Sequence, residues 1–342
     1  MDQMVKEVKE VKEKAKNDDI IFEIKNLKKH FPVYGGFFKK QVASVKALDD
    51  VSLYIKKGET LGVVGESGCG KTTLGKNLMM LQKPTEGEII FDFDGEKKDV
   101  TKLNKEELFN FRKKVQMVFQ DPYSSLNPSK KIYNAFDEPL KAHGYNDKKQ
   151  REEIMEKMMK MVNLQPEYIH RYPHEFSGGQ RQRICIARAL CINPEVVICD
   201  EPVSALDVSI QAQVLNLMKE IQKELKLTYI FIAHDLSVVE YMSDRIVVMY
   251  LGNIVEVASA KNLYKNAKHP YTEALLSSIP IPIIGAKKER IILEGDVPSP
   301  INKPSGCPFH NRCSKCMDIC KTEVPKLKDL GDEHLVCCHL YR

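Results

Sequence analysis

Short apolar segments recur along the chain in patterns that predict β-strands. Residues 20–27 (IIFEIKNL) and 51–55 (VSLYI) alternate apolar and polar side chains, as half-buried strands do. The stretch between them contains Pro32, Gly35 and Gly36 and predicts a loop. More uniformly apolar runs predict further strands at Thr60–Val64, Val196–Cys199, Tyr229–Ala233 and Ile246–Tyr250.

Helices are predicted between these strands. One follows a Gly-rich turn and runs from Thr72 to Gln82, and another runs from about Ser209 to Leu225. Residues 104–180 are rich in Lys, Glu and Met and predict a helical insertion, because apolar residues recur there at helical spacing at Ile154, Met158, Met161 and Val162. Strands that alternate with helices indicate an α/β fold with a parallel sheet covered on both faces.

The two ends of the chain differ from this pattern. Residues 1–19 alternate Lys and Glu around Val5, Val8, Val11 and Ala15, which fits either a partner-binding helix or, as we expect, a solvated extension. The segment lacks the apolar core of a signal peptide, and no run approaches the ~18–20 apolar residues of a membrane-spanning helix. We therefore expect a cytosolic location. Prolines and cysteines become dense beyond about residue 265, and we expect a domain boundary at 265–280.

Composition adds one unusual feature. Lys and Arg number 52 against 47 Asp and Glu, a net charge of +5 that is too mild and too evenly spread to indicate nucleic-acid binding. The 43% hydrophobic and 29% charged residues are typical of a globular protein. Of the 10 cysteines, however, most lie in one short segment, at Cys307, Cys313, Cys316, Cys320, Cys337 and Cys338.

The Gly-rich turn matches a phosphate-binding loop. Gly65 to Thr72 (GESGCGKT) fits the pattern G-x-x-x-x-G-K-S/T, with a strand before it and a helix after it. Its glycines let successive N–H groups point at phosphate oxygens, Lys71 can reach the β- and γ-phosphates, and the Thr72 hydroxyl can ligate Mg²⁺. The predicted nucleotide-binding residues here are Gly65, Ser67, Gly68, Cys69, Gly70, Lys71, Thr72 and Thr73, with Cys69 contributing its backbone.

A second acidic motif follows the strand at Val196–Cys199. Asp200 is predicted to hold Mg²⁺ through water, and Glu201 to polarise the attacking water. An apolar strand followed by carboxylates is common. It becomes the expected partner of a phosphate loop that lies earlier in the same chain.

Further motifs resemble those of ABC ATPases. FSGGQRQR, residues 176–183, is similar to their signature motif, and SALD, residues 204–207, is similar to their D-loop. Gln120 resembles the Q-loop glutamine that touches Mg²⁺ and the attacking water, and His234 resembles the switch histidine that contacts the γ-phosphate. The resemblance also implies an aromatic residue stacked on adenine, for which Phe31 fits best and Tyr34 is the alternative.

The resemblance implies a fold and domain limits. The expected fold is a phosphate-loop (RecA-like) α/β core with an antiparallel β subdomain, a helical subdomain at about 121–180 and a small Cys-rich C-terminal extension. The expected limits are 1–19 for the charged N-terminal extension, 20–268 for the ATPase domain and 269–342 for the C-terminal extension.

Three other segments indicate which subfamily of ABC ATPases the chain resembles. QDPYSSLNP (120–128), RYPHEF (171–176) and the tail from GCPFHNRC (306–313) to CHL (338–340) are similar to ATPases of oligopeptide and dipeptide importers. These segments do not specify the cargo, because nickel and glutathione importers share them. The C-terminal extension defined above belongs to this subfamily.

The resemblance also implies partners. Ser177, Gly179 and Gln180 would cap ATP bound to a neighbouring ATPase, and Asp207 of the D-loop is expected to bind nucleotide. Activity is therefore expected to require a dimer, with a related but distinct second subunit. Two transmembrane permease subunits and an external substrate-binding protein complete the expected importer, with this chain at the cytoplasmic face of the membrane. The rivals are a soluble ABC ATPase acting on ribosomes or DNA, and a redox-sensing metal module in the tail.

Four interpretations compete for the clustered cysteines. A cytosolic location disfavours disulfides, while zinc, an iron–sulfur cluster and free thiols remain open. In the subfamily, four tail cysteines hold a 4Fe–4S cluster in some members, and the matching positions are Cys307, Cys313, Cys320 and Cys338. Cys316 and Cys337 are additional. The expected role of a metal is structural, since a short Pro-rich tail has little core of its own.

Overall fold

The computed structural model describes residues 19–36, 40–279 and 290–341, which fall into two compact units. Unit 1 comprises the described parts of residues 1–103 and 234–342, and unit 2 comprises residues 104–233. The charged segment 1–18 lies outside the described residues. The domain limits expected from the sequence stay a prediction.

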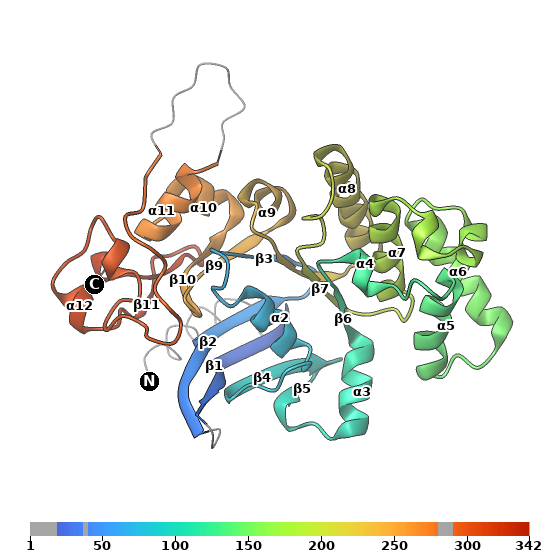
Figure 1. Cartoon of the computed structure of the whole chain (residues 1–342), viewed down its shortest axis with the longest axis horizontal. Coiled ribbons are helices and arrows are strands. Elements are labelled where there is room, and N and C mark those ends of the chain that lie inside the picture. Colours follow the sequence, from blue (N-terminus) through green and yellow to red (C-terminus); the bar gives the residue numbers. More distant parts are fainter. Residues whose placement is uncertain (1–18, 37–39, 280–289, 342) are drawn as a thin grey trace, which may run out of the picture. The chain divides into compact units, whose positions relative to one another are not determined.

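Unit 1 contains an antiparallel sheet near the N-terminus, in the order β2-β1-β4-β5 (Figure 1). Its strands are β1 (Ile20–Gly35), β2 (Lys40–Lys56), β4 (Glu86–Phe93) and β5 (Glu96–Asp99). Apolar side chains such as Phe22 and Ile24 are fully buried, as the alternating pattern predicted. The expected antiparallel β subdomain is confirmed.

The prediction of a loop around Pro32 is wrong. Strand β1 continues to Gly35, and Pro32 pairs with Ser44 of β2. The last residue pair between β1 and β4 is Lys28 with Glu86, so beyond this point β1 has only β2 along its side. A proline is tolerated there because an edge strand has N–H positions that need no partner.

A second set of strands in unit 1 carries the phosphate loop. β3 (Thr60–Val64) runs parallel to β9 (Arg245–Tyr250), and β9 pairs in turn with the antiparallel strand β10 (Asn253–Ser259). The helices among the described residues of this unit are α2 (Lys71–Leu78), α9 (Leu236–Met242), α10 (Ala260–Asn266), α11 (Pro270–Ser277) and α12 (Ile319–Thr322). Helix α2 ends before the predicted Gln82, because Met80 adopts a left-handed conformation with φ of 54°.

Unit 2 combines three parallel strands with helices. β6 (Val115–Val118) pairs with β7 (Val196–Asp200), and β7 pairs with β8 (Thr228–Ile232). The helices are α3 (Lys105–Lys114), α4 (Pro122–Ser125), α5 (Ile132–Ala142), α6 (Lys148–Met161), α7 (Gly178–Leu190) and α8 (Val208–Leu225). The predicted insertion is largely helical, but β6 within it was missed because VQMV is too short to show a period.

Short 3₁₀ turns connect several of these elements. They lie at Val100–Lys102, Pro166–His170, Pro173–Glu175, His310–Arg312 and His339–Tyr341. Among the residues that the structure describes, no helix has the length and apolar character needed to cross a membrane.

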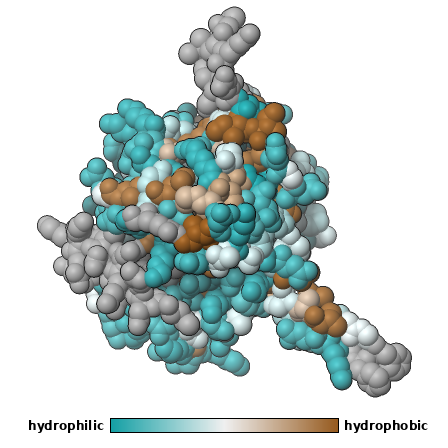
Figure 2. All heavy atoms as spheres, turned by 90° about the vertical axis from the view of Figure 1, so that its left-hand side faces the viewer, coloured by the Kyte–Doolittle hydropathy of each residue, from teal (hydrophilic) through white to brown (hydrophobic). Residues whose placement is uncertain are grey.

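The C-terminal extension packs onto the rest of unit 1. Its strand β12 (Leu335–Cys337) pairs with the edge of β10, and β11 (Leu327–Asp329) pairs with β12. Phe309 is buried, with its ring centroid 5.2 Å from that of Tyr250 and 5.4 Å from that of Tyr271. Figure 2 shows the face that carries the extension, where separate hydrophobic patches lie among hydrophilic atoms.

His269 joins this packing to a buried carboxylate. Its ring Nδ1 accepts the N–H of Tyr271 at the start of α11, and the backbone N–H of His269 donates to the Glu256 carboxylate at 2.9 Å. Glu256 is fully buried and also contacts His334 at 2.6 Å. Burial lowers the pKa of His269 to about 4, with the nearby Glu256 acting in the opposite direction.

We expect this histidine to make unit 1 sensitive to acid. The unfolded chain binds a proton at His269 below about pH 6.5, whereas the folded chain binds it only near pH 4, so stability is lost as pH falls through this window. The free energy of unfolding should be about 2 kcal/mol lower at pH 5 than at pH 7. In urea unfolding at pH 7 and pH 5, His269→Asn, which keeps a cap acceptor without this titration, should show a smaller shift in midpoint.

The exposed His170 offers a matched control. His170→Asn should leave the wild-type difference between the two pH values unchanged. An equal acid shift in wild type and His269→Asn would contradict the assignment.

Candidate functional site

The predicted phosphate loop connects β3 to α2 in unit 1. Lys71 is 7% exposed, and its ammonium group donates to the carbonyl oxygens of Gly65 at 2.7 Å and Glu66 at 3.1 Å. Ser67 and Gly68 are exposed, whereas Thr72 and Thr73 are half-buried in the first turn of α2. The lysine therefore lies within the curl of the loop, with a positive charge where phosphate is predicted to bind.

Neighbouring backbone closes on the loop at both ends. A Cβ atom added at Gly65 would clash with the carbonyl oxygen of Met249, and one added at Gly70 would clash with that of Ala47. The carbonyl of Cys69 accepts the N–H of Gly252 at 2.9 Å. Burial raises the pKa of the Cys69 thiol, which keeps it neutral and agrees with a backbone role for this residue.

Glu66 has contacts that the motif did not predict. Its carboxylate accepts two hydrogen bonds from the guanidinium of Arg312, at 2.8 and 3.1 Å. Its N–H donates to the hydroxyl of Tyr271 at 2.8 Å. The sequence did not predict that Arg312 and Tyr271 contact the loop, because any residue is allowed at the x positions of the motif, where Glu66 lies. The one available signal was an arginine inside the Cys-rich segment.

The other candidate residues of unit 1 are His234 and the two aromatic residues. His234 is exposed and precedes α9, whose N-cap is Asp235. Phe31 is half-buried on β1 opposite Val45, with the ammonium of Lys29 5.0 Å from its ring centroid. Tyr34, the alternative, is 62% exposed. Both aromatic side chains thus remain candidates for an adenine contact.

In unit 2, the structure brings Gln120 and Glu201 together. Val118 at the end of β6 pairs with Cys199 near the end of β7, so the residues that follow both strands emerge at the same sheet edge. The side-chain amide of Gln120 donates to the Glu201 carboxylate at 2.8 Å. Asp200, the last residue of β7, is 4% exposed. A carboxylate, an amide and a buried acid therefore share one edge of the parallel strands.

Glu201 has an unusual backbone. Its φ is 47°, in the left-handed region that non-glycine residues rarely adopt. Its N–H donates to the carbonyl of Ile232, and its own carbonyl accepts from the N–H and hydroxyl of Ser204. Such strain persists only where surrounding contacts hold it, and it is concentrated at functional sites.

The signature residues begin helix α7. Ser177 is its N-cap: the Ser177 hydroxyl accepts the N–H of Gln180, and the Gln180 side chain accepts the N–H of Ser177. Gly179 is buried, and a Cβ added there would clash with Ile210 of α8. Asp207 is exposed at the N-terminus of α8. These residues thus start two adjacent helices.

Several of the tail cysteines lie near Cys307. Burial raises the pKa of Cys307 to about 12, and Cys320, Cys338 and Cys313 add to that rise. The thiol of Cys337 instead donates to the carbonyl of Pro325. In the described part of the chain, no group of three or more His, Cys, Asp or Glu side chains is arranged to hold a metal ion.

Comparison with known proteins gives two family matches and several close relatives. The ABC transporter family matches residues 48–204, and the C-terminal region of oligopeptide/dipeptide transporters matches residues 255–320. The oligopeptide transport ATP-binding protein AppF of Bacillus subtilis is 53% identical, covering 96% of this chain and 99% of AppF. The putative oligopeptide transport ATP-binding protein YkfD of the same organism is 50% identical over 94% of this chain and 96% of YkfD.

Solved structures are also similar. The ATP-binding cassette MJ0796, in a dimeric post-hydrolysis state bound to ADP and Pi, has a TM-score of 0.60 and 30% identity, covering 70% of this chain and 99% of MJ0796. Clostridium perfringens cbiO1, part of the cbiONQ ABC transporter complex, has a TM-score of 0.60 and 27% identity, covering 72% of this chain and 92% of cbiO1. Both support the ATPase fold.

The close approach at Gly70 predicts the effect of a single methyl group. Gly70 has φ of 105° and lies against Ala47, so Gly70→Ala must displace the loop and should weaken ATP binding at least about tenfold. Gly68 also has a positive φ, of 78°, but a Cβ there meets no atom within 4 Å. Titration with a fluorescent ATP analogue should find a smaller loss for Gly68→Ala. Equal losses would contradict the steric argument.

Proposed function

This chain belongs to the ABC transporter ATPases of the oligopeptide/dipeptide group, and we propose that it hydrolyses ATP to power a peptide importer. The observation that carries the catalytic part is the hydrogen bond between Gln120 and the strained Glu201, in a chain that also holds a complete phosphate loop. The near full-length similarity to oligopeptide transport proteins supports the cargo class.

We assign the nucleotide chemistry as the motifs predict. Lys71 and the backbone of Gly65 to Thr73 hold the phosphates of ATP, and Phe31 contacts the adenine, with Tyr34 as the alternative. Thr72, Gln120 and Asp200 supply oxygen ligands of the kind that Mg²⁺ prefers, and bound Mg²⁺ would neutralise charge on the transferred phosphoryl group. Glu201 polarises the attacking water, while His234 contacts the γ-phosphate.

The proposed working form is a dimer of ATPases. Ser177, Gly179, Gln180 and Asp207 would act on ATP held by a neighbouring subunit, which we propose is a related but distinct chain. Support comes from MJ0796, which is dimeric with ADP and Pi bound. In this chain, the capping box at Ser177 and Gln180 would keep the signature residues in place at the start of α7.

Transport requires further subunits. An ABC importer ATPase implies transmembrane permease partners and a substrate-binding protein. We propose that the helical segment after Gln120 contacts two permease subunits, and that this chain works at the cytoplasmic face of the membrane. Within the same group, nickel and glutathione remain the alternative cargoes to peptides.

The catalytic assignment predicts a separation of binding from turnover. Glu201→Gln keeps the size of the side chain but removes the charge that polarises water. ATP should still bind, while phosphate release by the assembled transporter should fall by about two to three powers of ten. Near-normal turnover would contradict the role of Glu201.

A control for Glu201→Gln is the same substitution at Glu195, near the other end of β7. Glu195 precedes this strand and pairs with Lys114, remote along β7 from Glu201. Glu195→Gln should therefore change turnover less than about twofold.

A 4Fe–4S cluster on Cys307, Cys313, Cys320 and Cys338 is a separate proposal, with zinc as the alternative. Its support is that Cys320, Cys338 and Cys313 lie near enough to Cys307 to raise the pKa of that thiol further beyond the effect of burial, and that four thiolates suit both metals. The proposed role of a metal there is structural, and we assign it no step of ATP hydrolysis.

Visible absorption distinguishes these metals. An iron–sulfur cluster should absorb near about 400 nm after anaerobic purification, whereas zinc is colourless and requires elemental analysis. Cys320→Ser should abolish the absorption, and Cys316→Ser should retain it. A chain that contains neither iron nor zinc would contradict the proposal and leave free thiols.

A further inference from the structure

The C-terminal extension contacts the phosphate loop through one buried arginine. Arg312 lies in the 3₁₀ turn His310–Arg312, between Cys307 and Cys313. Its Nη1 and Nη2 donate to the two carboxylate oxygens of Glu66, at 2.8 and 3.1 Å. A paired geometry of this kind fixes both position and angle, which a single hydrogen bond does not.

Further contacts surround this pair. The Arg312 side chain is 8% exposed, and its Nη1 also reaches the hydroxyl of Tyr250 at 3.4 Å. The rings of Tyr250 and Tyr271 lie 4.7 Å apart, and both pack on Phe309 of the extension. Because Tyr271 also accepts the Glu66 N–H, the backbone and the side chain of Glu66 are both held.

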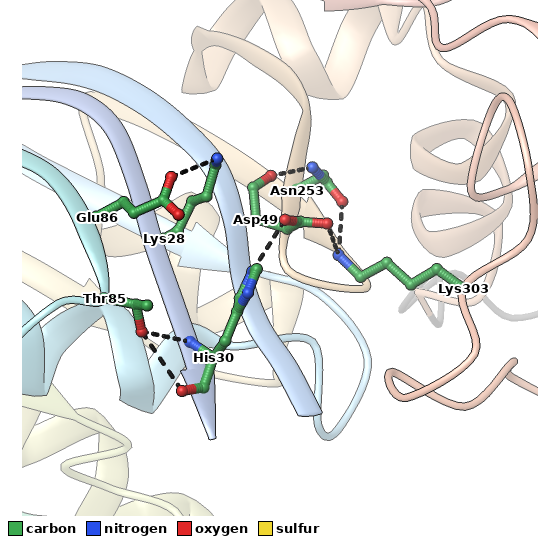
Figure 3. A network of polar contacts seen from close by, with 7 residues as sticks. All are labelled: Lys28, His30, Asp49, Thr85, Glu86, Asn253 and Lys303. Atoms are coloured by element: carbon green, nitrogen blue, oxygen red, sulfur yellow. Dashed lines mark hydrogen bonds and ion pairs between the residues drawn. The ribbon is translucent and has the colours of Figure 1, made fainter. Parts of the chain in front are cut away.

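The other end of the loop, at Cys69, has an indirect link to the same extension. Lys303 donates to the carboxylate of Asp49 at 3.1 Å and to the side chain of Asn253 at 3.0 Å (Figure 3). The N–H of Asp49 donates to the carbonyl oxygen of Gly252. The N–H of Gly252 in turn donates to the carbonyl oxygen of Cys69 in the phosphate loop. His30 contacts the same Asp49, so this support is tied into the antiparallel sheet as well.

Charge gives the Arg312 contact a consequence for ATP. Glu66 places a carboxylate at the second position of a loop that binds a polyanion. Without a counter-charge, this carboxylate would repel the phosphates, and its side chain would no longer fix the first turn of the loop. Arg312 supplies the counter-charge to Glu66 and also fixes the position of its side chain.

We propose that Arg312 is a positioning residue for ATP: by pairing with Glu66, it lets the docked C-terminal extension set the affinity of the phosphate loop. The inference rests on the proposed function of that loop. Arg312 touches neither ATP nor the reacting atoms and acts through Glu66. A binding defect that depends on the presence of the Glu66 carboxylate is therefore its signature.

A double-mutant cycle on the full-length chain tests this. Arg312→Gln should weaken binding of a fluorescent ATP analogue about tenfold, which raises KM for ATP in the assembled transporter while kcat changes less than about twofold. Arg312→Lys, which keeps the charge, should recover part of the affinity. The double variant Arg312→Gln/Glu66→Gln should bind as Glu66→Gln alone does, because the carboxylate that needs Arg312 is gone.

Lys315 provides the control. It pairs with Glu273 at 2.7 Å in the same extension, and Lys315→Gln should leave ATP affinity unchanged. If Arg312→Gln acted by unfolding the extension, the double variant would stay as weak as Arg312→Gln, and the inference would be overturned.

Two outcomes separate this inference from the proposed function. A wild-type chain that binds ATP, together with an Arg312→Gln variant that binds it equally well, overturns the inference alone. A wild-type chain that binds no ATP, or a Lys71→Ala variant that binds it as tightly as wild type, overturns the proposed function and the inference with it.

Discussion

The phosphate loop depends on restraint from outside its own segment, and much of unit 1 is arranged around that need. Helix α2 has Gly70 as its N-cap and so lacks a side-chain cap, and Lys71 bonds to carbonyl oxygens of the loop itself. The curl is completed by backbone from β2, by the end of β9 and by the turn at Gly252. Because phosphate binding uses N–H groups, the hydrogen bond from Gly252 to the carbonyl oxygen of Cys69 does not compete with the ligand.

Unit 2 applies a similar principle to a carboxylate. Glu201 leaves β7 with a left-handed backbone, which costs free energy that the surrounding contacts must offset. Ile232 and Ser204 hold its backbone, and Gln120 orients its side chain. In each unit, neighbours from other strands or loops therefore add to the contacts that the group assigned to chemistry makes within its own segment.

The parts that could be predicted from the sequence are those in which a local pattern determines the structure. Uniformly apolar runs marked β3, β7, β8 and β9, and parallel pairing then brings the ends of β6 and β7 together. The loop expected at Pro32 failed because edge position, a tertiary property, decides whether a strand tolerates proline. The pair of Glu66 and Arg312 was not predictable, since no local pattern relates residues so far apart in the chain.

The Cys-rich composition of the tail indicates metal chemistry, whereas its contacts support the positioning role that we propose for Arg312, which needs no metal. Phe309, Lys303, Arg312 and β12 attach the extension to strands and side chains that also support the phosphate loop. Since both depend on the same contacts, docking of the extension and ordering of the loop are thermodynamically linked. Linkage is reciprocal: if the docked extension tightens ATP binding, ATP must by the same factor stabilise the docked extension.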